Sequence, residues 1–381
     1  MTARAHRAAA RSARRIVVKV GSSTLTSHGA IRPKAFTNLA RQVSAIAAQG
    51  REVVLVSSGA IAVGSHVLGW SHPGRSIPEK QAAAAVGQIG LVELWQRRFA
   101  RHERKVAQVL LTRTGLEHRE RYLNARRTLL KLLELGVVPI VNENDTVATE
   151  EIRFGDNDNL SATIVNLIGA DLLVILTDVE GLLERRPTPA DPSPPLIATV
   201  PEITPAIEAI ASGAGSAFGS GGMATKLEAA RTAAHSGAAT VLCRGGARDA
   251  LLRVAAGDEI GTIFLAGDGG RRLASRKHWL AFTTRTRGEI VVDAGAAQAL
   301  TERGRSLLPA GVVAVRGRFQ MGDAVSCVDE TGRELARGLA AYPSDAVAAI
   351  AGRATREIER VLGYSNGGEV IHRDDLVVLD R

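Results

Sequence analysis

Two lysines of this chain are placed where they could hold a phosphate group. Lys19 ends the apolar segment 14–20 and is followed by Gly21 and two serines, whose amides and hydroxyls could approach an anion. Lys226 follows the glycine-rich segment 219–222 in the first turn of a predicted helix, where an ammonium opposes the helix dipole unless an anion is bound. A lysine at the end of a strand is, by itself, solvated about as often as it binds an anion. Free amides, a helix dipole and an ammonium that point the same way predict an anion site.

A dense group of polar side chains occupies residues 141–161. Its members are Asn142, Asn144, Asp145, Asn157, Asp158 and Asn159. The stretch begins where a parallel strand would deliver its carboxyl end, and ligands of open α/β sheets bind at that edge. Residues 147–154 alternate well enough for a short hairpin over the site, and the apolar helix 160–168 follows. The stretch therefore predicts a site for a polar small molecule, and the simpler alternative is a polar loop with a capped helix.

These features fit phosphoryl transfer, in which a protein mainly positions two substrates and neutralises charge on the moving group. Two lysines suit that task, and a carboxylate must hold their ammoniums together against their mutual repulsion. Asp158 or Asp156 is the natural candidate, although either could also serve as a helix cap. The chain has no GxxxxGK[ST] loop and no GxGxxG after its first strand. The sequence therefore gives little support for assigning the chain to the P-loop proteins or to the nicotinamide-dependent dehydrogenases.

Strands and helices alternate over the first two thirds of the chain. Strand-like apolar segments are 14–20, 52–57, 105–112, 137–141, 170–177 and 238–243. Helical segments are about 33–49, 78–100, 118–135, 160–168, 201–211 and 223–237. Polar residues follow several of the strands. This alternation predicts an α/β fold with a largely parallel sheet that is sandwiched by helices.

The character of the sequence changes after residue 267. From His278 onward the elements are shorter and mostly strand-like, which predicts a small β-rich second domain. With 381 residues, two domains are expected. The predicted organisation is a disordered basic tail at 1–14, a first domain at 15–267, a linker at 268–277 and a second domain at 278–381.

Charge and cysteine content narrow the class of protein. The net charge is +9, but residues 278–381 hold 13 Arg, no Lys and 14 acidic residues, so the second domain is not basic. That balance argues against a strong footprint for nucleic-acid phosphates. Cys243 and Cys327 are far apart and without metal-ligand spacing, which indicates buried thiols in a reducing compartment. No apolar run approaches the roughly 18 residues of a membrane span, so we expect a cytoplasmic protein without a membrane partner.

Six segments, taken in order, closely resemble the bacterial glutamate 5-kinases of the amino-acid kinase family. They are VVKVGSSTLT, VSSGAIAVG, LLTRTGLEHRERYLNARRTL, PIVNENDTVATEEIRFGDNDNLSA, LLTDVEGL and GSGGMATKLEAA. The resemblance covers about residues 15–264. The region with GEIVVDAGA, GRSLLPAGV and GYSNGGEVIHRDDL looks like the PUA domain that many of these kinases carry, and the basic tail is extra.

The resemblance implies the amino-acid kinase fold with a small C-terminal PUA-like barrel. It also implies ATP-dependent phosphorylation of the γ-carboxylate of L-glutamate to L-glutamyl 5-phosphate, the first step of proline biosynthesis, with ATP and Mg²⁺ as cofactors. Feedback inhibition by proline and assembly into a homo-oligomer, a dimer or tetramer, are expected on the same ground.

The resemblance assigns roles to residues of this chain. Lys19 and Lys226 flank the transferred phosphoryl group, and Asp156 and Asp158 match acidic residues that organise the lysines and the magnesium. The residues that match glutamate-binding positions are Ser58, Asp145 and Asn157. Those that match the ATP site are Lys19, Gly21, Thr177, Asp178, Ser220, Gly221, Gly222, Met223, Ala224, Thr225 and Lys226. The chemistry agrees, because Asp145 can receive an α-ammonium, and Ser58 and Asn157 can hydrogen-bond carboxylate oxygens.

Two alternatives stay open from the sequence. Another amino-acid kinase acting on a different carboxylate or carbamate would share the phosphate site and differ in the acceptor pocket. An RNA-binding protein would act through the PUA-like domain, since such domains commonly bind structured RNA, but the charge balance of that domain opposes it.

Overall fold

The protein divides into two compact units with separate hydrophobic cores, Met1–Arg272 and Leu273–Arg381. The computed structural model describes residues 6–27, 30–148, 156–185, 187–188, 191–211, 222–266, 280–281 and 284–379. The division lies within segment 268–277, which the sequence predicts as a linker and which is outside the described residues.

A mostly parallel sheet forms the centre of the first unit. Its described strands have the order β5-β6-β4-β1-β7-β9-β10-β8. The bounds are β1 Arg15–Val20, β4 Glu52–Ser57, β5 Val106–Leu111, β6 Val138–Glu143, β7 Leu172–Thr177, β8 Thr199–Val200, β9 Ala239–Arg244 and β10 Thr262–Phe264. In the sheet, β5, β6, β4, β1, β7 and β9 pair in parallel with their neighbours, whereas β10 runs antiparallel to β9. The predicted fold class is confirmed.

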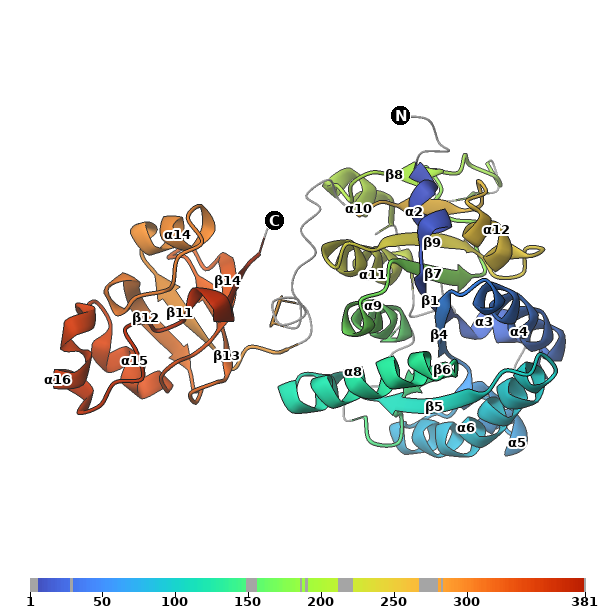
Figure 1. Ribbon diagram of the computed structural model, residues 1–381, viewed down its shortest axis with the longest axis horizontal. Helices are drawn as coiled ribbons and strands as arrows, with labels where there is room; N and C mark the ends of the chain where they lie inside the picture. The colour runs from blue at the N-terminus through green and yellow to red at the C-terminus, as the bar shows by residue number, and fades with distance from the viewer. Residues whose placement is uncertain are drawn as a thin grey trace. The chain divides into compact units, whose positions relative to one another are not determined.

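Helices cover both faces of this sheet (Figure 1). One face carries α8 (Arg119–Glu134), α9 (Asp156–Ile168) and α11 (Met223–His235), with α10 (Pro205–Ala211) against α11. The other carries α4 (Pro33–Ala48), α6 (Ile77–Ala100) and α12 (Ala250–Ala256), with α5 (Ala60–Val67) packed on α6. Short elements are α3 (Ser22–Leu25), β2 (Thr26–Ser27), β3 (Ala30–Ile31) and α7 (Arg113–Leu116). Because both faces are covered, every residue of the central strand β7 is buried, as in other parallel sheets.

The expected disordered tail at 1–14 is wrong for its described part. Residues Ala8–Ser12 form helix α2, whose Ala10 is 1% exposed. Arg7 is 2% exposed and donates hydrogen bonds to the carbonyl oxygens of Ile260, Ala198 and Gly261 at 2.9, 3.1 and 2.8 Å. The arginine-rich composition suggested a solvated charge run. Arg7 is buried because its fork of N–H donors satisfies three backbone acceptors at once.

The second unit holds a five-stranded sheet with the order β12-β11-β13-β14-β15 among its described strands. The strands are β11 Gly288–Val292, β12 Val312–Gly317, β13 Ala324–Val328, β14 Glu334–Leu339 and β15 Leu376–Val378. Helices α14 (Ala294–Thr301), α15 (Ser344–Ile350) and α16 (Ile358–Leu362) accompany them, with 3₁₀ turns at Pro309–Gly311, Thr355–Glu357 and Arg373–Asp375. The described strands β12 and β15 are not paired with each other, so closure into a barrel stays a prediction.

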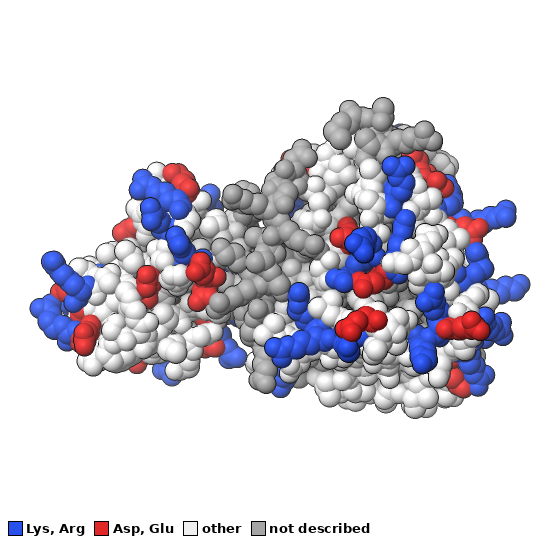
Figure 2. Space-filling model, in the orientation of Figure 1, with Lys and Arg blue, Asp and Glu red and all other residues white. Residues whose placement is uncertain are grey.

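Basic and acidic side chains are interspersed on the face that Figure 2 shows. In the second unit several arginines form ion pairs with acids, among them Arg316 with Glu289 at 3.4 Å and Arg337 with Glu334 at 2.8 Å. Arginines paired in this way have less charge to offer to an external phosphate backbone. Among the described helices, none is both long and apolar enough to cross a lipid bilayer.

Candidate active site

The carboxyl ends of four neighbouring parallel strands form the base of the site. Val20 of β1 is in register with Ser57 of β4 and with Leu176 of β7, and Val56 of β4 is in register with Val141 of β6. Because these strands run in the same direction, the polar residues that end or follow them lie along one edge of the sheet. This is the edge at which open α/β sheets bind ligands.

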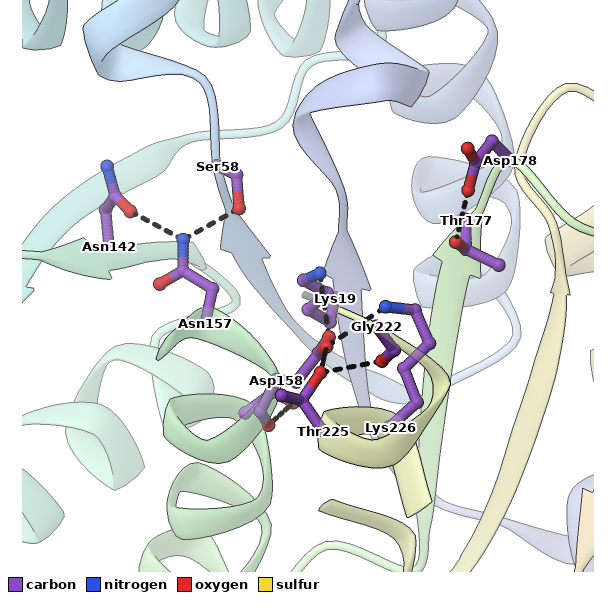
Figure 3. Close-up of polar contacts among 11 residues, drawn as sticks. Lys19, Ser58, Asn142, Asn157, Asp158, Thr177, Asp178, Gly222, Thr225 and Lys226 are labelled. Carbon is purple, nitrogen blue, oxygen red and sulfur yellow. Dashed lines mark hydrogen bonds and ion pairs between the residues drawn. The ribbon is translucent and has the colours of Figure 1, made fainter. Parts of the chain in front are cut away.

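A buried ion triad lies at the centre of this edge (Figure 3). Lys19 Nζ is 2.7 Å from Asp158 Oδ1, and Lys226 Nζ is 3.2 Å from Asp158 Oδ2. Thr225 donates its hydroxyl to Asp158 Oδ2 at 2.8 Å. The three charged residues are 6%, 7% and 0% exposed for Lys19, Lys226 and Asp158. The structure thus brings together two lysines that are 207 positions apart in the sequence, through the aspartate at the start of α9.

The charges of this triad shift the pKa values of its members. Burial is the largest influence on Lys19 and lowers its pKa, the ammonium of Lys226 lowers it further, and Asp158 only partly offsets both. Burial alone would raise the pKa of Asp158, but the two ammoniums and the hydrogen bonds from Lys19 and Thr225 outweigh it and lower that pKa. Two buried ammoniums therefore meet at one carboxylate. Positive charge gathered in this way suits an anion such as a phosphoryl group.

The start of helix α11 completes the cationic side of the site. Gly222 is its N-cap in extended conformation, and its carbonyl oxygen lies 2.9 Å from Thr225 Oγ1, so that it shares the single hydroxyl proton with Asp158. Thr225 therefore ties the helix start to Asp158. Lys226, the fourth residue of the helix, points back to the same carboxylate, so its cost against the helix dipole is offset by an ion pair. Met223 and Ala224 fill the first turn between Gly222 and Thr225.

On one side of the triad, the end of β7 carries two of the predicted nucleotide residues. Thr177 donates its hydroxyl to Asp178 Oδ1 at 2.9 Å (Figure 3). Gly21, after β1, donates its N–H to the carbonyl oxygen of Leu176 at 3.2 Å. A Cβ at Gly21 would lie 3.7 Å from Lys19 Nζ. Glycine there keeps the space beside the ammonium open to a ligand.

On the other side, two strand ends and the helices α9 and α6 contribute an amide and hydroxyl network. Asn157 Nδ2 donates to Ser58 Oγ at 2.7 Å and to Asn142 Oδ1 at 3.1 Å (Figure 3). Asn142, 2% exposed, donates through Nδ2 to Gln88 Oε1 of helix α6 at 2.9 Å. Ser58 and Asn157 were predicted as substrate residues, and the structure places their side chains in contact. Asp145 lies in the turn after β6.

Some predicted positions lie beyond what the structure describes. Ser220 and Gly221 are outside the described residues, as is most of the hairpin expected at 147–154. Asp156 begins helix α9, and its side chain is not described.

Two residues of the network were not among the predicted site residues. Asn142 belonged to the polar stretch but was given no role, although it is the first polar residue after the apolar run of β6. Gln88 was missed, because a single amide in the alanine-rich segment 82–90 looks like an ordinary side chain on the solvent-facing side of a helix. The one available signal was Gly87 beside it, since a glycine inside a helix usually marks a close approach of another element.

Magnesium prefers oxygen ligands such as carboxylates. The described residues contain no group of three His, Cys, Asp or Glu side chains that could hold a metal ion. Both oxygens of Asp158 face ammonium groups. Magnesium is usually held by one or two carboxylates together with substrate phosphates, not by an all-protein cage. The described residues therefore fit an ion that arrives with a nucleotide and not a resident metal centre.

Comparison with known proteins identifies the family of this chain. The model of the amino acid kinase family matches residues 14–245, and that of the PUA domain matches residues 288–362. Curated glutamate 5-kinases of Burkholderia mallei and Burkholderia pseudomallei are 54% identical over 367 residues, which are 96% of this chain and 98% of each relative. The glutamate 5-kinase of Burkholderia thailandensis is 53% identical over the same shares. Among solved structures, an isopentenyl phosphate kinase of T. acidophilum is 17% identical, covers 65% of this chain and 99% of its own, and has a TM-score of 0.46. On the two family models and the full-length relatives, the chain belongs to the glutamate 5-kinases of the amino acid kinase family and carries a C-terminal PUA domain.

Proposed function

We propose that this protein transfers the γ-phosphoryl group of ATP to the γ-carboxylate of L-glutamate, giving ADP and L-glutamyl 5-phosphate, the first step of proline biosynthesis. The observation that carries the proposal is the buried triad of Lys19, Asp158 and Lys226, in which two ammoniums meet at one carboxylate. It lies between a hydroxyl and carboxylate pair suited to a nucleotide and an amide network suited to an amino acid. The names of the full-length relatives support the same reaction.

The chemistry asks little of the protein beyond placement and charge. An oxygen of the glutamate γ-carboxylate attacks the γ-phosphorus, the new P–O bond forms, and the bond to the bridging oxygen breaks with its electron pair leaving on ADP. The attacking carboxylate is already ionised near pH 7, so no general base has to remove a proton. This suits a site whose central carboxylate, Asp158, is held by two ammoniums and is not available as a base.

Lys19 and Lys226 are the proposed catalytic residues. Negative charge spreads over the phosphoryl oxygens as the group moves, and ammoniums fixed in a buried place stabilise that charge without reorganising. Asp158 acts as a positioning residue, because it holds both ammoniums and does not itself face the reacting atoms. Its hydrogen bond from Thr225 fixes the carboxylate and, with it, the start of helix α11.

The nucleotide enters this scheme as MgATP. Thr177 and Asp178 at the end of β7, Gly21 after β1 and the residues from Ser220 to Lys226 form the proposed nucleotide side. Magnesium that travels with the phosphates would supply charge neutralisation on the β- and γ-phosphoryl oxygens. Asp156, at the start of the same helix as Asp158, stays a proposed partner of that ion.

Ser58, Asp145 and Asn157 form the proposed glutamate side. The carboxylate of Asp145 and the amide oxygen of Asn157 suit an α-ammonium, because both N–H groups of Asn157 are donated to Ser58 and Asn142, while the hydroxyl of Ser58 can donate to a carboxylate oxygen. Ser58 and Asn157 already bond each other at 2.7 Å, so the pocket is organised before the substrate enters. Preorganisation of this kind lowers the cost of binding.

The proposal is tested by the choice of acceptor. Purified protein with MgATP is assayed for ADP release and for acyl phosphate, trapped with hydroxylamine as a hydroxamate, using L-glutamate, L-aspartate and N-acetyl-L-glutamate as acceptors. We expect both products with free glutamate and at least about 100-fold lower kcat/KM with the other two, which lack the correct chain length or the α-ammonium. Turnover confined to another carboxylate or to a carbamate would reject the glutamate assignment in favour of a different kinase of this family.

We further propose that proline inhibits the enzyme at the glutamate side and that the chain works as a homo-oligomer, a dimer or tetramer. Proline carries the same α-carboxylate and a charged α-nitrogen, so a pocket that recognises the head group of an α-amino acid would accept it. Inhibition that is competitive with glutamate and not with ATP supports this site. Inhibition competitive with ATP alone would contradict it.

A further inference from the structure

Gln88 is the distal member of a chain of three side-chain amides with a single direction. Asn157 donates to Asn142 at 3.1 Å, and Asn142 donates to Gln88 at 2.9 Å. Asn157 donates its other N–H to Ser58 Oγ at 2.7 Å. Rotating any one amide by half a turn would set like atoms against each other. The network therefore fixes the orientation of each amide relative to its neighbours.

Two buried atoms at the ends of this chain have no hydrogen-bond partner among the described residues. They are Gln88 Nε2, a donor, and Asn157 Oδ1, an acceptor. A buried polar group without a partner costs about 1–3 kcal/mol, so a structure seldom keeps two of them within one network unless something else completes it. One donor and one acceptor on the same network would suit the carboxylate and the ammonium of an α-amino acid.

The position of Gln88 is set by an unusually close crossing of α5 and α6. A Cβ on Gly87 would lie 1.8 Å from the carbonyl oxygen of Ala60, and a Cβ on Gly64 would lie 1.7 Å from that of Ala83. Only glycine fits at these two points. Helix α5 begins two residues after Ser58, so the crossing fixes Gln88 relative to the same strand end that carries Ser58.

The order of the groups along the site decides which end of glutamate Gln88 would meet. Figure 3 shows Thr177 and Asp178 on one side, the Lys19, Asp158 and Lys226 triad in the middle, and Asn157, Ser58 and Asn142 on the other side. Gln88 continues the network beyond Asn142. A glutamate whose γ-carboxylate faces the lysines extends its α-carbon toward the amides, because its two carboxylates are three carbons apart.

We propose that Gln88 is a specificity-determining residue that binds the α-carboxylate of glutamate through Nε2, while its Oε1 holds Asn142 in place. This inference rests on the proposed function and assigns a contact that is additional to Ser58, Asp145 and Asn157. Asn157 Oδ1, the other buried atom without a partner, then accepts a hydrogen bond from the α-ammonium.

A purely structural role for Gln88 makes a different prediction. If Gln88 only supported Asn142, its Oε1 would be the atom that matters. The change Gln88→Glu, which keeps an oxygen facing Asn142, would then be nearly silent. The contact proposed here makes the same change damaging, because a second carboxylate would face the substrate carboxylate. The two roles therefore separate in one variant.

The experiment compares glutamate with its α-carboxamide analogue, L-isoglutamine, in wild-type protein, Gln88→Glu and Gln88→Met. For Gln88→Met we expect KM for glutamate to rise about 10- to 100-fold, the usual worth of a hydrogen bond to a charged group. For Gln88→Glu we expect a larger rise, and the ratio of kcat/KM for glutamate to that for isoglutamine should fall at least about 10-fold. The amide of isoglutamine can donate to the new carboxylate.

Two readouts separate this role from a general loss of structure. KM for ATP and kcat at saturating glutamate should stay within about threefold of wild type, because the hydrogen bond of Gln88 is to Asn142 on the proposed glutamate side. The matched control is Gln96→Glu, the same charge change at an exposed position of helix α6, which should change nothing. If Gln88→Glu does not fold, Gln88→Met carries the test by its KM for glutamate.

The outcomes that overturn the inference are distinct from those that overturn the function. Unchanged KM for glutamate in Gln88→Met rejects the contact while wild-type turnover on glutamate leaves the function standing. A Gln88→Glu enzyme that loses activity equally on glutamate and isoglutamine also rejects it. A wild-type protein that makes no acyl phosphate from glutamate rejects the proposed function, and the inference falls with it.

Discussion

Lys19 and Asp158 form a fully enclosed ion pair at the carboxyl edge of the sheet, with 2.7 Å between Lys19 Nζ and Asp158 Oδ1 and side chains that are 7% and 0% exposed. Removing such a pair from water is costly, and the attraction between its members repays that cost only with good geometry and further hydrogen bonds. Here the second ammonium and the Thr225 hydroxyl provide further contacts. The arrangement holds positive charge in place more than it stabilises the fold, which agrees with a catalytic use.

Replacing either lysine of the triad should nearly abolish turnover. Lys19→Ala and Lys226→Ala each remove one fixed ammonium from the developing charge of the phosphoryl group, so we expect kcat to fall about 10²- to 10³-fold or more. The measurement is ADP release at saturating glutamate and MgATP. Lys34→Ala, at an exposed position of α4, is the control and should keep wild-type kcat. Undiminished turnover in either triad variant would refute the proposed mechanism.

Asp158→Asn should cost stability as well as activity. The near-isosteric amide leaves two buried ammoniums without their carboxylate, and breaking a buried ion pair by removing one partner typically costs about 3–5 kcal/mol. Urea denaturation followed by circular dichroism measures the loss. Asp191→Asn, which removes the half-buried partner of the exposed Arg185, should cost less than about 1 kcal/mol. Equal losses in the two variants would mean that the triad is not coupled as the geometry indicates.

The pH dependence of activity should report the lowered pKa of Lys19. The catalytic form is the ammonium, so kcat/KM for ATP should fall as pH rises through a value below the ordinary 10.5 of lysine. In Asp158→Asn the attraction that raises this pKa is gone, while burial and the repulsion from Lys226 remain. The alkaline limb of the residual activity should therefore move to lower pH. A limb that stays in place or moves up would show that another group controls it.

The lowered pKa of Lys19 also makes the free energy of unfolding depend on pH. Between the lowered folded-state pKa of Lys19 and 10.5, the unfolded chain binds more protons than the folded one, so this lysine makes the folded state more stable as pH rises through that window. Asp158 acts at the other end of the scale. Its lowered pKa contributes stability above the ordinary value of 3.8, and this is lost as pH falls through the folded-state value.

The parts of the site that follow strand ends could be predicted from the sequence, and the parts that depend on helix crossings could not. Lys19 and Thr177 end apolar strands, Ser58 follows one, and parallel strands deliver their ends to one edge, so periodicity was enough to bring them together. Gln88 is set by the contact between α5 and α6, which depends on two glycines 23 positions apart. Sequence alone does not tell which helices cross, so the amide of Gln88 looked like an ordinary exposed side chain.

The prediction of a disordered N-terminal segment failed for a different reason. Arg7 belongs to a run that composition alone assigns to solvent, yet it is 2% exposed with three carbonyl partners from the loop before β8 and the turn before β10. Whether an arginine is solvated or buried depends on acceptors that lie about 190 to 250 positions away, and no local pattern contains them.

Arg7 should therefore contribute to stability. Arg7→Ala leaves three buried or half-buried carbonyls without this donor, at about 1–3 kcal/mol for each group that water does not reach. Arg11→Ala, exposed on the same short helix, should change stability by no more than about 0.5 kcal/mol. Urea denaturation of the full-length variants measures both. A destabilisation by Arg7→Ala no greater than that of Arg11→Ala would restore the view of this segment as a loose tail.

The crossing of α5 and α6 should couple stability to glutamate binding. Gly87→Ala places a Cβ where only 1.8 Å separates it from the Ala60 carbonyl, so backbone must move, and overpacking of this kind costs about 1–3 kcal/mol or more. Because Gln88 is the next residue, the shift of α6 should also move it away from Asn142. We expect a lower urea midpoint and a raised KM for glutamate, with KM for ATP much less affected.

Gly90→Ala on the same helix is the matched control for that experiment. Its Cβ would meet only the side-chain Cγ1 of Val63 at 3.3 Å, and alanine is favoured over glycine inside a helix by about 1 kcal/mol. The two effects oppose each other, so Gly90→Ala should be close to neutral in stability and in KM for glutamate. If Gly87→Ala lowered stability but left KM for glutamate unchanged, α6 would act only as packing. The acceptor pocket would then end at Asn142.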